Sequence, residues 1–144
     1  MRVVVNFFST LRFDAFAAGL VSENGSLIWN TFLGSSGDDY GHAVAVDGND
    51  NSYVCGMSDT TWGSPWRGYT GNWDAFAAKL ISDNGSRVWN AFLGGNGDDM
   101  GTGIAVDGSG NVYAGGTSTA TWGSPVDNFT ANNDAFAARI EKTV

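Results

Sequence analysis

The feature that most constrains this chain is an internal repeat of 60 residues. The pentapeptide Asp-Ala-Phe-Ala-Ala occurs at 14–18, 74–78 and 134–138. Residues 14–73 and 74–133 align without a gap, and 34 of the 60 aligned positions are identical. Tandem repeats build extended or circular arrays, because each copy buries its apolar face against its neighbour. We therefore divide this single repeat domain into a lead-in strand at 1–13, repeats at 14–73 and 74–133, and the start of a third repeat at 134–144.

Each repeat has the pattern of short β-strands. The segment 74–80 is followed by Asn84-Gly85, a pair that tolerates the positive φ of a tight hairpin turn. No stretch carries an apolar stripe at i, i+3, i+4 and i+7 that is long enough for a helix. Four short strands in each of several tandem repeats predict an all-β fold built from β-propeller blades of four antiparallel strands.

Four motifs follow one another in a fixed order in the chain. They are Asp-Ala-Phe-Ala-Ala-Lys at 74–79, a Trp-to-Gly segment at 89–95, Gly-Asp-Asp at 97–99, and an Ile-Ala-Val-Asp hairpin at 104–117. In this order they resemble the SBBP-type (seven-bladed) β-propeller repeat family, and the resemblance covers residues 14–140. It implies a propeller architecture, often in exported or surface proteins. It implies no single activity, because the propeller fold serves many functions.

Related propellers also suggest how the strands divide into blades. By analogy, the Ile-Ala-Val-Asp strand is innermost and the Trp-containing strand outermost. With this assignment of strands to blades, the chain supplies about two to two-and-a-half blades. These are the outer two strands of one blade, all four strands of the next blade, and the inner three strands of the last blade. The expected strands lie at about 14–20 and 27–33, then 42–47, 52–57, 74–80 and 87–93, then 103–107, 111–116 and 134–140.

Two to two-and-a-half blades do not close a ring, which takes roughly four to eight. Bare strand edges pair readily with another chain. We therefore expect a homo-oligomeric ring, a trimer or a tetramer, in which at least one blade is shared between chains. Residues 2–8 align with the outer strand 87–93 and are predicted to supply the missing strand of a final blade. The alternative is a piece of a longer propeller with no selected function.

Composition excludes several classes of partner and site. The formal net charge is −8, which argues against nucleic acid and anionic membranes, since both need a basic face. No apolar run approaches the roughly 18 residues of a membrane-spanning helix. One cysteine and one histidine exclude an intrachain disulfide and a Cys- or His-rich metal site, so we expect no metal and no cofactor. The apolar N-terminal stretch is too short for a signal peptide, whereas the family resemblance suggests export, so localisation stays open.

Strand alternation is expected to bring the Gly-Asp-Asp loops and the Trp-Gly-Ser-Pro loops to one face. Indole rings stack on the C–H faces of sugars, and carboxylates accept hydrogen bonds from sugar hydroxyls, so this face is a candidate carbohydrate site. A structural role competes with this interpretation: a Trp in every repeat can fill the space between blades, and an Asp after Gly can cap a loop. Trp66 and Trp73 are not repeated, which favours them as ligand-binding residues. The candidate residues are Trp62, Trp66, Trp73, Trp122, Asp38, Asp39, Asp98 and Asp99.

Three functional hypotheses follow. The leading one is a non-enzymatic propeller repeat protein that assembles with itself and presents a loop face for binding. The second is a lectin-like carbohydrate-binding module. The third is a hydrolase, against which the repetition of the Asp pairs argues, because a catalytic pair is usually built once. The acidic turns at 47–51 and 107–111 resemble calcium loops but lack the Glu at position 12 and the helices, so we expect hairpin turns.

Overall fold

The computed structural model describes residues 7–9 and 12–141, and all of its regular structure is β-strand. None of the described residues forms a helix that could cross a membrane. The strands are β1 (Phe7–Ser9), β2 (Arg12–Leu20), β3 (Leu27–Leu33), β4 (Asp39–Val46), β5 (Ser52–Ser58), β6 (Asp74–Leu80), β7 (Arg87–Leu93), β8 (Asp99–Val106), β9 (Val112–Ser118) and β10 (Asp134–Ile140).

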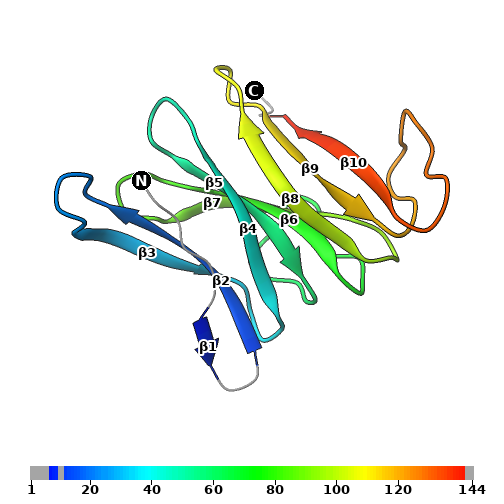
Figure 1. Ribbon diagram of the computed structural model, residues 1–144, viewed down its shortest axis with the longest axis horizontal. Coiled ribbons are helices and arrows are strands. Elements are labelled where there is room, and N and C mark those ends of the chain that lie inside the picture. The colour runs from blue at the N-terminus through cyan, green and yellow to red at the C-terminus, as the bar shows by residue number, and fades with distance from the viewer. Residues whose placement is uncertain (1–6, 10–11, 142–144) are drawn as a thin grey trace.

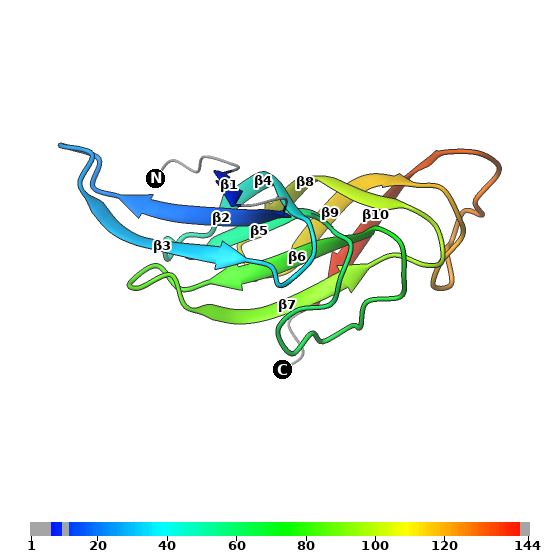
Figure 2. The ribbon, with the colours of Figure 1, turned by 90° about the horizontal axis from the view of Figure 1, so that it is seen from below.

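The strands form three antiparallel sheets that lie side by side (Figures 1 and 2). The first blade has the order β1-β2-β3, the central blade β4-β5-β6-β7, and the last blade β10-β9-β8. β4 and β8, the expected innermost strands, contact each other across the central and last blades. The predicted division into two outer strands, one four-stranded sheet and three inner strands is confirmed, and the arrangement is propeller-like.

β1 differs from the expectation for the N-terminus. Phe7–Ser9 pairs with the start of β2, with Phe8 opposite Phe13, so within one chain these residues lie on the first blade. The predicted strand at 2–8 was expected on the last blade. Its residues 2–6 lie outside the described part of the chain.

Small residues let the blades pack closely. Ala15 and Ala17 of β2 are fully buried in a cluster with Phe76 and Phe92 of the central blade. One repeat later, Ala75 of β6 packs in the same way towards Phe136 of the last blade. The two interfaces therefore repeat one packing scheme, in which alanines of one blade meet aromatic rings of the next.

Turn chemistry agrees with the sequence. The hairpins β2–β3 and β6–β7 turn at Gly25 and Gly85, whose φ angles are +73° and +70°, as Asn-Gly turns require. A close approach also explains Gly56 of β5: a Cβ added there would lie 1.7 Å from the carbonyl oxygen of Tyr40, beside the irregularity in β4 at 41–43. The backbones of β4 and β5 thus leave no room for a side chain at this position.

Candidate functional site

We use the name loop face for the surface formed by loops 34–38, 59–73, 94–98 and 119–133. Backbone hydrogen bonds join these loops in pairs: Asp59 N donates to the Asp38 carbonyl at 3.2 Å, and Thr119 N to the Asp98 carbonyl at 3.0 Å. The prediction that the Gly-Asp-Asp and Trp-Gly-Ser-Pro loops share a face is confirmed.

The second carboxylate of each Gly-Asp-Asp motif is turned inward. Asp39 is fully buried and accepts hydrogen bonds from Ser58 Oγ and from the backbone N of Ser35, the latter at 3.0 Å. Asp99 is equally buried and accepts hydrogen bonds from Ser118 Oγ and from Gly95 N, the latter at 2.9 Å. Both carboxylates were candidate ligand-binding residues; instead they cap their own loops, which is the competing structural role, because a buried acid needs donors close by.

Burial changes the pKa of two carboxyl groups at the base of the loop face, Asp39 and Asp74. It raises the pKa of Asp39, although the bonds from Ser58 and Ser35 oppose the change. Burial likewise raises the pKa of Asp74, which accepts hydrogen bonds from the backbone N and the hydroxyl of Thr70. Both carboxyl groups therefore take up a proton at a higher pH in the folded chain than in the unfolded chain.

The first carboxylate of each motif remains accessible, with different surroundings. Asp38 accepts a hydrogen bond from Phe13 N at 3.0 Å and lies 3.8 Å from the guanidinium of Arg12. The same guanidinium lies 3.8 Å from Asp59. Asp98 is exposed on the loop between the central and last blades. Of the four candidate carboxylates, Asp38 and Asp98 are therefore the two that solvent reaches.

Trp62 is a packing residue rather than part of the exposed face. Its side chain is 3% exposed and meets Phe76 and Phe92 edge-on, with ring centroids 5.1 and 5.7 Å away. It belongs to the cluster that joins the first and central blades. The candidate ligand-facing role of Trp62 is therefore wrong, and the competing interpretation holds: the ring packs against Phe92 of β7 and fills space between blades. Trp122, its counterpart in the second repeat, is only half-buried.

Trp66 is exposed but lies apart from the carboxylates. Its side chain is 59% exposed and stacks on Trp89, with ring centroids 4.9 Å apart and 23° between the ring planes. Its backbone N donates to the Asn90 carbonyl at 2.9 Å, which places Trp66 along the outer edge of β7. The structure thus does not bring Trp66 into one site with Asp38 or Trp73.

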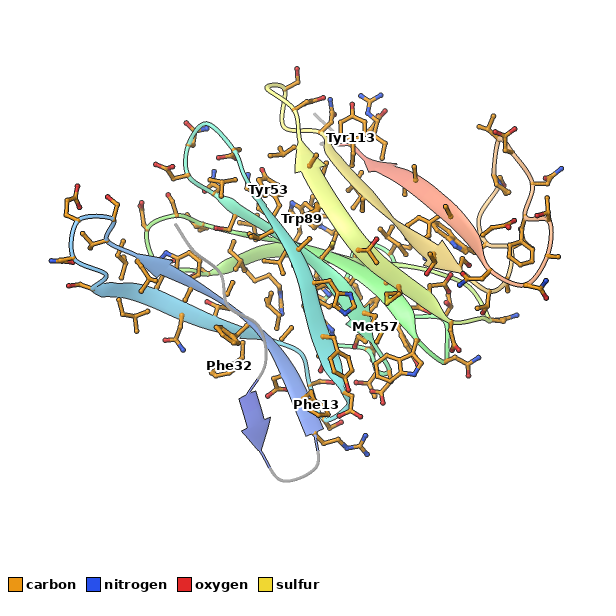
Figure 3. The ribbon with its side chains drawn as sticks, in the orientation of Figure 1. Phe13, Phe32, Tyr53, Met57, Trp89 and Tyr113 are labelled. Carbon is orange, nitrogen blue, oxygen red and sulfur yellow. The ribbon has the colours of Figure 1, made fainter. Side chains whose placement is uncertain are left out.

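Trp73 belongs to a cluster that we name the aromatic row, consisting of Phe13, Tyr40, His42 and Trp73. The Tyr40 ring lies between Phe13, at 5.1 Å, and Trp73, at 5.7 Å, and stacks on His42 at 6.5 Å. The label of Phe13 in Figure 3 marks the end of the first blade at which this row lies. The row gathers residues from β2, β4 and the loop before β6, where the first and central blades meet.

The row occurs once among the described residues. Phe13 and Trp73 occupy the same repeat position, immediately before Asp-Ala-Phe-Ala-Ala, and that position is Asn133 in the next copy. Met100 likewise replaces Tyr40. The candidate site is therefore specific to one blade junction, not a property of every repeat.

Charge and polarity surround the row. Burial raises the pKa of Tyr40, and the carboxylates of Asp38 and Asp59 raise it further, so the phenol stays protonated at neutral pH. His42 Nδ1 lies 2.8 Å from the carbonyl oxygen of Gly101. Chemically, the row offers ring faces for apolar contact, and its neighbours offer donors and acceptors for hydroxyl groups.

Phe13, Tyr40 and His42 were not predicted as neighbours of Trp73. Two signals were available. Tyr40 follows the buried Asp39, and strand alternation turns consecutive side chains to opposite faces. Phe13 lies one repeat length before Trp73.

The acidic turns form hairpins, as expected. Asp107 accepts hydrogen bonds from the backbone N atoms of Ser109 and Asn111 and from the Asn111 side chain, all at 2.8–2.9 Å. These bonds lower the pKa of Asp107 to about 2, and the bond from the Asn111 side chain has the largest effect. Within the described part of the chain, no group of three or more His, Cys, Asp or Glu residues is placed to hold a metal ion.

Residues 28–61 and 88–121 each match the family model of the SBBP beta-propeller repeat. The chain carries two SBBP repeats. Each SBBP match begins in the outer strand of one blade, runs through the two inner strands of the next, and stops before the Trp residue of the long loop. A search of curated proteins found no significant match.

Proposed function

We propose that this chain is a non-enzymatic SBBP-repeat protein that assembles with itself into a ring of blades and presents its loop face for binding. The observation that carries this proposal is the incompleteness of the two outer blades. Apart from the short β1, β2 has no partner on its inner side, and β10 has no strand on its outer side among the described residues. Free strand edges with β-forming side chains favour pairing with another chain.

Exposed apolar side chains support the same proposal. Phe32 and Leu27 of β3 are 60% and 59% exposed, whereas Phe92, the counterpart of Phe32 in the central blade, is fully buried. The cost of leaving such side chains in water is removed when a further blade covers them. The buried positions of Asp39 and Asp99 support a non-enzymatic role, because a substrate does not reach them.

The mass in solution tests the assembly. Light scattering behind size exclusion is expected to show one discrete species of about 45 or 60 kDa, three or four chains of 15.1 kDa, with two blades contributed by each chain. A 15 kDa monomer at all concentrations would overturn the proposal. A continuum of large species would favour an incomplete propeller that aggregates through its edges.

The aromatic row favours a second function, carbohydrate binding at the loop face. Tyr40, held between Phe13 and Trp73, offers a partly exposed aromatic surface next to Asp38. Sugar binding uses this combination of ring faces and hydroxyl acceptors. In a ring, one row per chain makes the binding multivalent.

Titration with a panel of mono- and oligosaccharides, followed by calorimetry, tests this second function. Trp73→Ala is expected to abolish the binding heat, whereas Trp66→Ala, which removes an equally large ring on the edge of β7, leaves it unchanged. If no sugar in the panel gives heat with the wild-type chain, or if both variants bind like wild type, the aromatic row is not a carbohydrate site.

A further inference from the structure

The strand inventory holds one strand too many for whole blades. Counted from the innermost strand, β2, β6 and β10 each have the third position of a blade. Each of the other three positions occurs twice: β4 and β8 are innermost, β5 and β9 are second, and β3 and β7 are outermost. The nine strands β2–β10 thus make two complete blades and one spare third strand. The extra strand falls in the blade that two chains would share. There, β10 of one chain and β2 of the next chain would compete for the same third position, beside β9.

A groove of about 510 Å³ lies on the last blade between β10 and loop 119–133. In the central blade the corresponding space holds β7. There, the Trp66 backbone N donates to Asn90 O at 2.9 Å, and Phe92 N donates to Arg67 O at 3.0 Å, so loop and β6 hold β7 from both sides. The central blade therefore shows what fits the groove: a strand of the β7 type.

β3 is a strand of this type, and several of its side chains, Asn30 and Phe32 among them, are still exposed. Leu27–Leu33 has Trp, Asn, Phe and Leu where Arg87–Leu93 has them. Phe32 is 60% exposed, whereas Phe92 is buried against Trp62 at 5.7 Å. In the last blade Trp122 packs on Phe136 at 5.2 Å but has no counterpart of Phe92 among the described residues.

A polar contact matches as well. Asn90 Nδ2 donates to the Trp62 carbonyl at 2.9 Å, and Asn30 of β3, its counterpart, is exposed. The Trp122 carbonyl occupies the same place in the last blade. One feature differs: Arg67, which donates to the carbonyls of Phe92 and Gly94, is replaced by Asp127.

A second groove, of about 270 Å³, fits the turn before β3. It lies between the central and last blades and is lined by Trp89, with Tyr53 beside it (Figure 3). At the preceding junction Trp29 holds the place of Trp89 and is covered by the turn of the next hairpin, donating from Nε1 to the Ser82 carbonyl at 2.6 Å. The turn at 21–26, with the same Asn-Gly-Ser sequence, would cover Trp89 in the same way.

We infer that the last blade takes up the β2–β3 hairpin of a second copy of this chain, with β2 of that copy replacing β10 beside β9. This rests on the assembly proposed above and specifies which strands are exchanged. β3 is joined to β2 by a tight turn, so it reaches the groove only together with β2. β10 leaves, and the incoming Asp-Ala-Phe-Ala-Ala segment restores the pairing of the identical outgoing one.

The edge of β2 is suited to this exchange. β1 pairs with Arg12–Asp14 only, so 15–20 has no strand partner on that side among the described residues. Meanwhile Ala15 and Ala17 stay buried against the central blade of their own chain. The second copy thus keeps its own blade contacts while it completes the blade of its neighbour.

Disulfide trapping in the full chain tests the exchange. In a Cys55→Ala background, Ala18→Cys with Ala114→Cys places thiols on β2 and β9, which belong to different blades of one chain. In the register of β9 with β10, Ala114 lies opposite Ala138, whose repeat equivalent in β2 is Ala18. Mild oxidation is expected to give covalent dimers and larger multimers on a non-reducing gel.

The matched control is Ala114→Cys with Ala138→Cys in the same background. It is expected to form an intrachain disulfide that holds β10 in place, giving a single-chain band and, in light scattering, loss of the assembled species. If the locked variant still assembles and the 18–114 pair gives no covalent multimer, the exchange is wrong while the assembly stands. If the wild-type chain is monomeric, the assembly itself is wrong, so the two failures are distinguishable.

Discussion

Asn90 of β7 donates a hydrogen bond from its side-chain amide to the backbone carbonyl of Trp62, 28 residues earlier in the chain, at 2.9 Å. The bond connects loop 59–73 to β7, the outer strand of the central blade. Both residues are buried, so water does not replace this donor when it is lost.

Replacing Asn90 by Ala is therefore expected to lower the free energy of unfolding by about 1–3 kcal/mol, the cost of leaving a buried carbonyl without its donor. Urea denaturation at fixed protein concentration measures the change. Asn128→Ala, on the exposed part of the equivalent loop, serves as control and is expected to shift the midpoint little. Equal midpoints for both variants would show that the Asn90 bond does not stabilise the loop.

Trp62 and Trp66 should differ sharply in their effect on stability. Trp62→Ala opens a large cavity under β7 and is expected to cost about 3–5 kcal/mol. Trp66→Ala removes only a stacked, largely exposed ring and is expected to cost about 0.5–1.5 kcal/mol. Thermal unfolding of the two variants provides the comparison, and a Trp66 variant as unstable as the Trp62 variant would contradict the packing described.

Gly56 should not tolerate a methyl group. Gly56→Ala drives Cβ into the carbonyl oxygen of Tyr40, so a loss of at least about 1–3 kcal/mol is expected from the forced separation of β4 and β5. Gly48→Ala is the matched control, because a Cβ there meets nothing within 4 Å. The control is expected to be neutral or to stabilise the chain by about 0.4–1 kcal/mol, through the unfolded state. Similar denaturation midpoints for the two variants would refute the close approach.

Acid should remove the contribution of Asp107 to stability. Its pKa is lowered from 3.8 to about 2 on folding, so the unfolded chain takes up this proton first as the pH falls. The contribution is present in full above about pH 4 and is lost between about pH 4 and 2. The raised pKa values of Asp39 and Asp74 act with the opposite sign, which makes a variant comparison necessary.

The comparison is between wild type and Asp107→Asn, by urea denaturation from pH 2 to 6. The wild-type chain is expected to be more stable at pH 6, with the difference shrinking towards pH 2. Asp83→Asn, at an exposed hairpin turn, controls for the loss of one negative charge. A difference between wild type and Asp107→Asn that stays constant over this range would contradict the role of the Asn111 and Ser109 bonds.

Much of the fold could be predicted from local sequence. The turn residues Asn24-Gly25 and Asn84-Gly85 and the alternation in Asp74–Leu80 specify strands and hairpins within a few residues of themselves. Repetition then places the same elements 60 residues apart. The pairing of β1 was not predictable in this way, because its short segment resembles an outer strand yet pairs with the nearest free edge.

The candidate site was predicted less well, for a physical reason. Whether Asp39 faces solvent or its own loop depends on Ser58, 19 residues away, and the aromatic row needs two strands and a loop from two blades. Such contacts join residues far apart in the sequence. The repeats do not reveal them, because identical motifs have different neighbours at each blade junction.

The sequence by itself determined the repeat, the strand order within each blade and the SBBP family to which the repeats belong. Only the tertiary structure decided which side chains those strands cover. Trp62 and Trp122 stand in identical Thr-Trp-Gly-Ser-Pro segments, yet one is 3% exposed and the other only half-buried. The difference arises because β7 lies over Trp62, while no strand lies over Trp122 among the described residues; burial depends on the neighbouring strand and not on the motif.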